Sequence, residues 1–180
     1  MMSSQRLNQE QILKYLQVFG GSGRKVEGSL DHVLNELRAI GTDILFPFLM
    51  SQINDRNGDI NIRCQSSRAL LNIDKNKGIE LLLPFFNDSD STFRWDICGL
   101  MHEFGDERVI EALINRMKND PDPQIRGTAA YALGGIGIPD TIPALQETVN
   151  NDFESDNLGY SPSFCAESAI NEIQKKTDQK

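Results

Sequence analysis

A pattern that recurs roughly every 32 residues constrains the fold of this chain more than any other sequence feature. An Asn-Asp pair marks each recurrence, and the pairs begin 33, 32 and 32 residues apart, at Asn54, Asn87, Asn119 and Asn151. Arginines follow nearly the same period, at Arg63, Arg94 and Arg126. A repeat of this length, built of two helices, is typical of an α-solenoid, in which each unit stacks on the next.

The clearest copy of the repeat, residues 119–150, predicts two short helices joined by a glycine-rich turn. Asp122 followed by Pro123 is a typical helix start, because aspartate caps free backbone amides and proline suits the first helical position. The apolar residues of the first helix recur at spacings of three and four and predict one buried face: Ile125, Ala129, Ala132 and Leu133. We expect the glycines at 134, 135 and 137 to end this helix, and Asp140 to cap the second.

The strings D-P-D-P-Q-I-R-G-T-A-A-Y-A-L-G-G-I-G, at 120–137, and D-S-D-S-T-F-R-W, at 88–95, carry a family resemblance. They resemble HEAT repeats of the short bacterial type, also called PBS-lyase HEAT-like repeats. The resemblance implies an all-α, armadillo-like fold: an α-solenoid with a right-handed superhelix of antiparallel helix pairs, in about four to five repeats. In that family the arginine usually binds an aspartate of a neighbouring turn. We therefore expect Arg63, Arg94 and Arg126 to form an internal ladder, although a row of arginines could also bind an anion.

We divide the chain into three parts. Residues 1–28 hold a tail, a capping helix from Leu7 to Phe19 and a Gly-rich linker, residues 29–175 form the solenoid, and residues 176–180 are a second tail. The linker lacks the spacing of a phosphate-binding loop. Within the solenoid we expect helices at 60–72, 77–86, 92–103, 107–118 and 164–175. The last helix follows an insert at 152–163, which places Ser163 where the repeat arginine belongs.

Charge and composition exclude several classes of protein. The 18 basic and 26 acidic residues give a net charge of −8, which argues against a nucleic-acid binder. The sequence has no apolar run long enough to span a membrane, and its first residues lack the apolar core of a signal peptide. The three cysteines are scattered rather than paired at metal-binding spacing. We therefore expect a cytoplasmic protein with no cofactor.

Two motifs invite a metal-site interpretation. An iron-dependent hydroxylase family with HEAT repeats uses several His-Glu pairs, but this chain has one, His102-Glu103, and its other histidine, His32, precedes a valine. The insert carries acidic residues at 152, 154 and 156, yet its glycine is displaced from the position that a calcium loop requires. With two histidines in all, no nucleophile–base pair can be argued. We expect a structural histidine and a solvated loop.

We expect the chain to bind another protein rather than to catalyse a reaction. The predicted binding surface is the polar, concave face of the second helices, together with Trp95 and two aromatic residues of the insert. The predicted contact residues are Glu80, Trp95, Glu111, Asn115, Lys118, Glu147, Phe153 and Tyr160. The chain would then be a non-enzymatic scaffold or adaptor, such as a toxin-neutralising immunity protein. The alternative is a phycobilin lyase subunit or phycobilisome-processing protein, whose partner would be a bilin-carrying protein.

Overall fold

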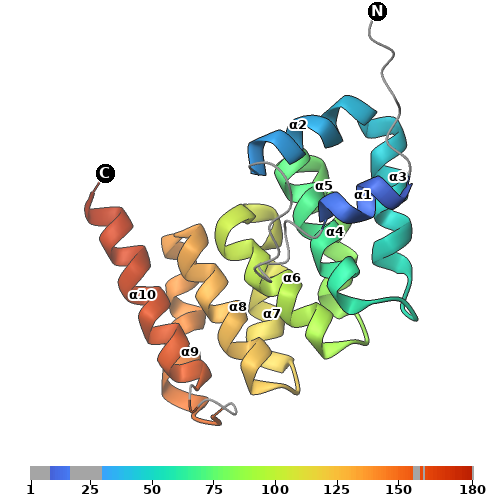
Figure 1. The fold of residues 1–180 in the computed structure, drawn as a ribbon. Helices are drawn as coiled ribbons and strands as arrows, with labels where there is room; N and C mark the ends of the chain where they lie inside the picture. The colour runs from blue at the N-terminus through green and yellow to red at the C-terminus, as the bar shows by residue number, and fades with distance from the viewer. Residues whose placement is uncertain (1–8, 17–29, 156–158, 160, 180) are drawn as a thin grey trace, which may run out of the picture. The chain divides into compact units, whose positions relative to one another are not determined.

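The computed structural model describes residues 9–16, 30–155, 159 and 161–179, and every regular element in them is a helix (Figure 1). The α-helices are α1 (Gln9–Leu16), α2 (Leu30–Ile40), α3 (Thr42–Asn54), α4 (Ile60–Ile73), α5 (Lys75–Leu82), α6 (Ser91–Phe104), α7 (Ile110–Asn119), α8 (Pro123–Ile136), α9 (Ile142–Asn151) and α10 (Pro162–Asp178). Short 3-10 helices, η2 (Leu83–Asn87), η3 (Glu107–Val109) and η4 (Pro139–Thr141), lie between them. None of these helices is both long and apolar enough to cross a lipid bilayer.

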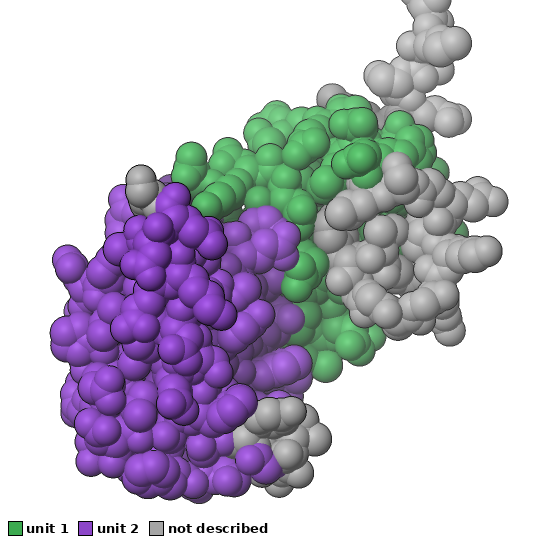
Figure 2. Space-filling view, turned by 90° about the vertical axis from the view of Figure 1, so that its left-hand side faces the viewer, with its two compact units in different colours: residues 1–78 green, residues 79–180 purple. Residues whose placement is uncertain are grey.

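The chain divides into two compact units, residues 1–78 and 79–180, with the boundary inside α5 (Figure 2). In the first unit α3 packs against α4, and the buried side chains are mostly leucine and isoleucine. Of the predicted capping helix at Leu7–Phe19, residues 9–16 are described and are helical. The flanking tail and linker lie outside the described residues, and the predicted three-part division stays a prediction.

The second unit consists of stacked helix pairs, and its elements follow the predicted repeat closely. The first helices α6, α8 and α10 lie side by side, with α8 in the middle, and the second helices α7 and α9 lie behind them (Figure 1). Each first helix begins at an oxygen-bearing side chain that accepts backbone amide hydrogens: Asp90, Asp122 and Ser161. The predicted cap at Asp122 and first-turn proline at Pro123 are therefore confirmed, as are the all-α class and the α-solenoid.

Two local predictions in this unit are wrong. Gly134 and Gly135 do not end α8, which continues to Ile136 and is capped by Gly137 in the left-handed conformation, at φ 76°. A Cβ atom on Gly134 would lie 2.8 Å from the Cα of Ala169, and one on Gly135 would lie 2.5 Å from His102. These glycines therefore let α8 approach both α10 and α6 closely. Asp140 does not cap α9, because η4 precedes α9 and supplies the helical start.

Buried arginine–aspartate bridges connect successive repeats. The Arg94 guanidinium on α6 donates to both carboxylate oxygens of Asp120, at 2.8 and 3.0 Å, and to the carbonyl oxygen of Asp88 at 2.9 Å. Arg126 repeats this arrangement on α8. It donates to both oxygens of Asp152, at 2.6 and 3.1 Å, and to the carbonyl oxygen of Asp120 at 2.9 Å. The predicted ladder is confirmed for these two arginines, and each arginine binds the aspartate 26 residues later.

The ladder ends where the sequence departs from the repeat. The hydrogen bond to Asp120 raises the pKa of Arg94 above its ordinary value. Burial alone would raise the pKa of Asp120, but hydrogen bonds from Arg94 and from the Asp122 amide hold it below its ordinary value. At the end of the ladder Ser163 stands in the arginine position, and its hydroxyl donates to the carbonyl oxygen of Val149 at 2.7 Å. In the first unit Arg63 is buried, and its Nε donates to the carbonyl oxygen of Ile53 at 2.8 Å.

We predict that Arg94→Ala lowers the free energy of unfolding by about 3–5 kcal/mol, because it leaves the buried Asp120 carboxylate without its bidentate partner. The matched control is Arg108→Ala, since Arg108 forms an exposed ion pair with Asp106 at 2.6 Å. Loss of such a surface pair costs at most about 1 kcal/mol. Urea denaturation of the two variants measures both quantities. Equal, small losses would contradict a structural role for the ladder.

Candidate functional site

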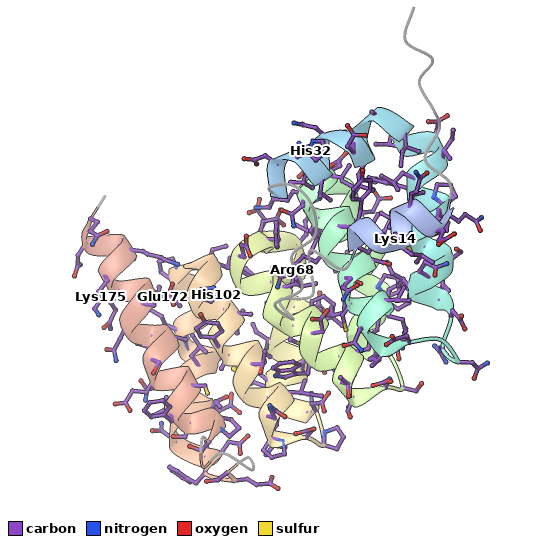
Figure 3. All side chains as sticks on the ribbon, in the orientation of Figure 1. Lys14, His32, Arg68, His102, Glu172 and Lys175 are labelled. Carbon is purple, nitrogen blue, oxygen red and sulfur yellow. The ribbon has the colours of Figure 1, made fainter. Side chains whose placement is uncertain are left out.

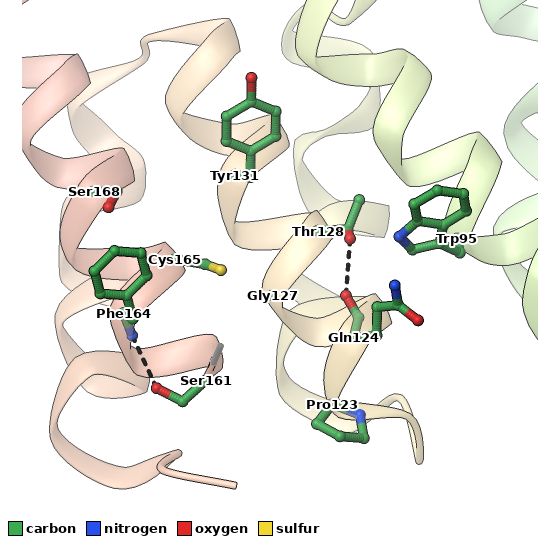
Figure 4. A pocket seen from close by; sticks show the side chains of 10 residues that line it. All are labelled: Trp95, Pro123, Gln124, Gly127, Thr128, Tyr131, Ser161, Phe164, Cys165 and Ser168. Carbon is green, nitrogen blue, oxygen red and sulfur yellow. Dashed lines mark hydrogen bonds between the residues drawn. The ribbon is translucent and has the colours of Figure 1, made fainter. Parts of the chain in front are cut away.

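A groove on the outer surface of the three first helices collects the large exposed aromatic side chains of the second unit. Trp95 comes from α6, Tyr131 from α8 and Phe164 from α10, and 43%, 48% and 54% of these residues, respectively, remain exposed (Figure 4). Exposed apolar residues scattered singly are ordinary, but a contiguous group of this size marks a binding surface. The groove has a volume of about 370 Å³.

The lining of the groove is apolar with a thin polar rim. It comprises Trp95, Pro123, Gln124, Gly127, Thr128, Tyr131, Ser161, Phe164, Cys165 and Ser168. None of these side chains carries a charge at neutral pH. The Thr128 hydroxyl donates to the carbonyl oxygen of Gln124 at 2.8 Å, and the Ser161 hydroxyl accepts from the Phe164 amide at 3.2 Å (Figure 4). The groove therefore offers aromatic faces with neutral hydrogen-bonding groups at its edge.

A polar hollow of about 510 Å³ adjoins the groove at the start of α8. Pro123 and Gln124 line both the groove and the hollow. The hollow is also lined by the carboxylates of Asp122 and Glu154. Glu154 accepts a hydrogen bond from Arg126 at 2.6 Å. Aromatic surface and carboxylate oxygens thus lie next to each other at one end of α8.

A second cluster surrounds His102 and links the same three helices. The His102 ring on α6 stacks on Tyr131, with ring centroids 3.9 Å apart and planes 3° apart. Its Nε2 atom lies 3.6 Å from Glu172 on α10, and Glu172 pairs with Lys176 at 2.7 Å. Figure 3 shows His102 and Glu172 on neighbouring helices. Burial would raise the pKa of Glu172, but Lys176 and His102 hold it below its ordinary value.

These residues do not fit an iron site of the kind that uses several His-Glu pairs. His102 is stacked on an aromatic ring and faces a carboxylate already paired with Lys176. Among the described residues, no group of three His, Cys, Asp or Glu side chains could hold a metal ion. Burial raises the pKa of the Cys98 thiol to about 12, which keeps it protonated and unsuited to metal binding or nucleophilic attack.

The predicted contact residues lie in two separate places. Trp95 lines the aromatic groove. Lys118 of α7 and Glu147 of α9 form an ion pair at 2.6 Å and line a different, polar hollow of about 530 Å³. Glu80, Glu111 and Asn115 are exposed, and Phe153 is 67% exposed, away from the groove lining. Tyr160 lies outside the described residues. A binding role for this set stays a prediction.

Sequence reasoning missed Tyr131 and Phe164, the two aromatic partners of Trp95. Both lie off the apolar stripe of their own helix, and this is the signal that could have identified them. A large aromatic residue outside the core-facing stripe is exposed by construction. That the three rings come together follows from the packing of α8 between α6 and α10, which no single helix reveals.

We predict a pH-dependent effect of Glu172→Gln. The folded-state pKa of Glu172 lies below its ordinary value of 4.5, so its ionised form contributes stability above pH 4.5 that is lost as the pH falls through the folded-state pKa. Because the side chain is one-third exposed, the loss at pH 7 should be under about 1 kcal/mol. Urea denaturation at pH 7 and pH 3 measures it. A loss that is equal at the two pH values would contradict the ionic role.

The curated relatives of this chain are enzymes. It is 30% identical over 105 residues to deoxyhypusine hydroxylase of Schizosaccharomyces pombe, a match that covers 58% of this chain and 33% of that protein. It is 26% identical over 96 residues to deoxyhypusine hydroxylase of Drosophila melanogaster, covering 53% of this chain and 32% of that protein. The matches therefore span about a third of the length of these relatives.

A solved structure shares the fold. The structure of human deoxyhypusine hydroxylase in complex with glycerol matches 84% of this chain and 49% of the human chain, with a TM-score of 0.62 and 16% sequence identity. At this identity the likeness concerns the arrangement of helices.

These relatives contradict the expected function. The chain was expected to be a non-enzymatic scaffold, adaptor or immunity protein, or else a phycobilin lyase subunit or phycobilisome-processing protein. The relatives instead carry the name of a different enzyme, deoxyhypusine hydroxylase. The prediction failed because the repeat pattern reports helix packing, which proteins of unrelated function share. The relatives are also eukaryotic, so they give no support to a specifically bacterial type of repeat.

The family comparison agrees with the architecture. Residues 79–157 match the model of HEAT repeats, and this range lies within the second compact unit. It contains the ladder arginines Arg94 and Arg126. This chain is therefore a HEAT-repeat protein.

Proposed function

We propose that this chain works in an enzymatic reaction of the kind named for its relatives, the hydroxylation of deoxyhypusine. In this proposal the second unit holds the substrate, and residues outside these 180 complete the reactive centre. The observation that carries the proposal is the similarity to about a third of each deoxyhypusine hydroxylase, combined with the lack of fit to an iron site. The repeat subtype, the short bacterial type, stays a prediction supported by the period of 32 or 33 residues.

The chemistry of the groove supports a substrate-binding role. Deoxyhypusine is a lysine side chain extended by an aminobutyl group, so it combines long methylene segments with positive charges. Methylene segments pack well on aromatic faces, and ammonium groups are attracted to both aromatic faces and carboxylates. The groove supplies the aromatic faces, and the adjoining hollow supplies the carboxylates of Asp122 and Glu154.

The arrangement of the two histidines supports a reactive centre outside this chain. His32 belongs to the first unit and precedes a valine, whereas His102 is stacked on Tyr131 in the second unit. The remaining ligands of a metal centre would therefore have to come from another chain or from further sequence. This chain's own contribution is binding and orientation of the substrate.

The test compares two forms of one substrate protein, carrying either deoxyhypusine or the unmodified lysine. We predict that the deoxyhypusine form binds at least about ten-fold more tightly, a difference of roughly 1.4 kcal/mol, by isothermal titration calorimetry. Equal affinity for the two forms, or no binding of either, would contradict the substrate assignment.

A second measurement tests where the reactive centre lies. The purified chain, supplied with ferrous iron and oxygen, is incubated with the deoxyhypusine form, and mass spectrometry detects the gain of one oxygen atom. We predict no gain with this chain alone. Hydroxylation by this chain alone would overturn the assignment of the reactive centre to residues outside it.

A further inference from the structure

We propose that the aromatic groove formed by Trp95, Tyr131 and Phe164 binds a basic, extended protein segment, in which lysine or arginine residues flank one apolar side chain. This inference deepens the proposed function, because the segment would belong to the substrate protein and would bind independently of deoxyhypusine. The groove would thus recognise the protein that carries the modified residue, in addition to the modification.

The distribution of charge identifies the chemistry of the occupant. Residues 79–180 contain eight basic and eighteen acidic residues, a net charge of −10, whereas residues 1–78 contain ten basic and eight acidic residues. The acidity of the chain is therefore concentrated in the unit that carries the groove. Such a field attracts cationic partners and repels nucleic acids and acidic proteins.

The basic groups near the groove are engaged by carboxylates of the same unit. Arg94 and Arg116 both bind Asp120, and Arg126 binds Asp152 and Glu154. With Asp122, these four carboxylates outnumber the three guanidinium groups at this end of the helices. Farther along α10, Lys176 pairs with Glu172 and donates to the carbonyl oxygens of Gly134 and Gly135. The surroundings of the groove are thus net negative.

The shape of the groove fits side chains that are apolar along their length and cationic at the tip. Lysine and arginine place their methylene stems on apolar surface while the charged group reaches water or a carboxylate. Trp95 and Tyr131 offer ring faces that also attract cations. Asp122 and Glu154 lie in the adjoining hollow, and the exposed carboxylate of Glu167 follows Ala166 and precedes Ser168 on α10. A neutral apolar partner would leave these carboxylates unused, and an acidic partner would be repelled.

The experiment uses Trp95, the only tryptophan of the chain, as the reporter. The probe is a short synthetic peptide in which lysines flank a single leucine, and its control has glutamate in place of each lysine. We predict that the lysine peptide shifts the fluorescence of Trp95 in a saturable manner and that salt weakens this binding. The glutamate peptide should have no effect. Equal responses to the two peptides would overturn the proposal.

Two variants locate the binding site. Phe164→Ala should weaken binding of the lysine peptide about ten-fold, as expected for an aromatic anchor. Phe153→Ala is the matched control, because Phe153 is exposed and does not line the groove; it should leave the affinity within about two-fold. Thr128→Lys adds a positive charge to the groove and should also weaken binding, and circular dichroism checks that each variant is folded. An equal loss in Phe153→Ala and Phe164→Ala, or no loss in either Phe164→Ala or Thr128→Lys, would contradict the assignment.

These outcomes separate the inference from the proposed function. If the lysine peptide binds through Phe164 while the two forms of the substrate protein bind equally, the groove proposal stands and the deoxyhypusine proposal fails. If the deoxyhypusine form binds more tightly while the lysine peptide does not bind at all, the groove proposal fails alone.

Discussion

The rest of the second unit depends on one buried interaction, the bridge from a repeat arginine to the aspartate 26 residues later. A guanidinium group can be buried only if its hydrogen bonds are satisfied, and the ladder achieves this with two carboxylate oxygens and one carbonyl oxygen per arginine. The bridge ties the start of one first helix to the turn before the next. Because Arg94 and Arg126 repeat the same geometry, α6 and α8 present equivalent faces to solvent.

This regular stacking creates the candidate site. Gly134 and Gly135 allow α8 to lie close to both of its neighbours, so that residues from three helices form one surface. The core stripes of these helices point inward, and the aromatic residues outside those stripes become the walls of a groove. The ladder residues themselves are occupied by one another. The same interaction that fixes the fold therefore removes Arg94 and Arg126 from the set of available binding groups, and leaves aromatic faces and surplus carboxylates to define what can bind.

The sequence predicts the local features and the period well, and the packing poorly. Asp122, Pro123 and the ladder arginines were predictable because each depends on a short, fixed spacing. The role of Gly134 and Gly135 was not, because glycines inside a helix and glycines that end one look alike until the neighbouring helices are in place. The groove was only partly predictable: Trp95 was identified, but its partners lie 36 and 69 residues farther along the chain. Function was misjudged because the repeat motif records core packing rather than chemistry.

The central claim is that the substrate protein contacts the outer face of the first helices. Hydroxyl-radical footprinting of this chain, with and without the deoxyhypusine-bearing protein, tests it most directly because aromatic side chains are modified readily when exposed. The account predicts that Trp95, Tyr131 and Phe164 become protected in the complex while Phe153 keeps its reactivity. Unchanged modification of these three residues, with protection confined to the second helices α7 and α9, would contradict it.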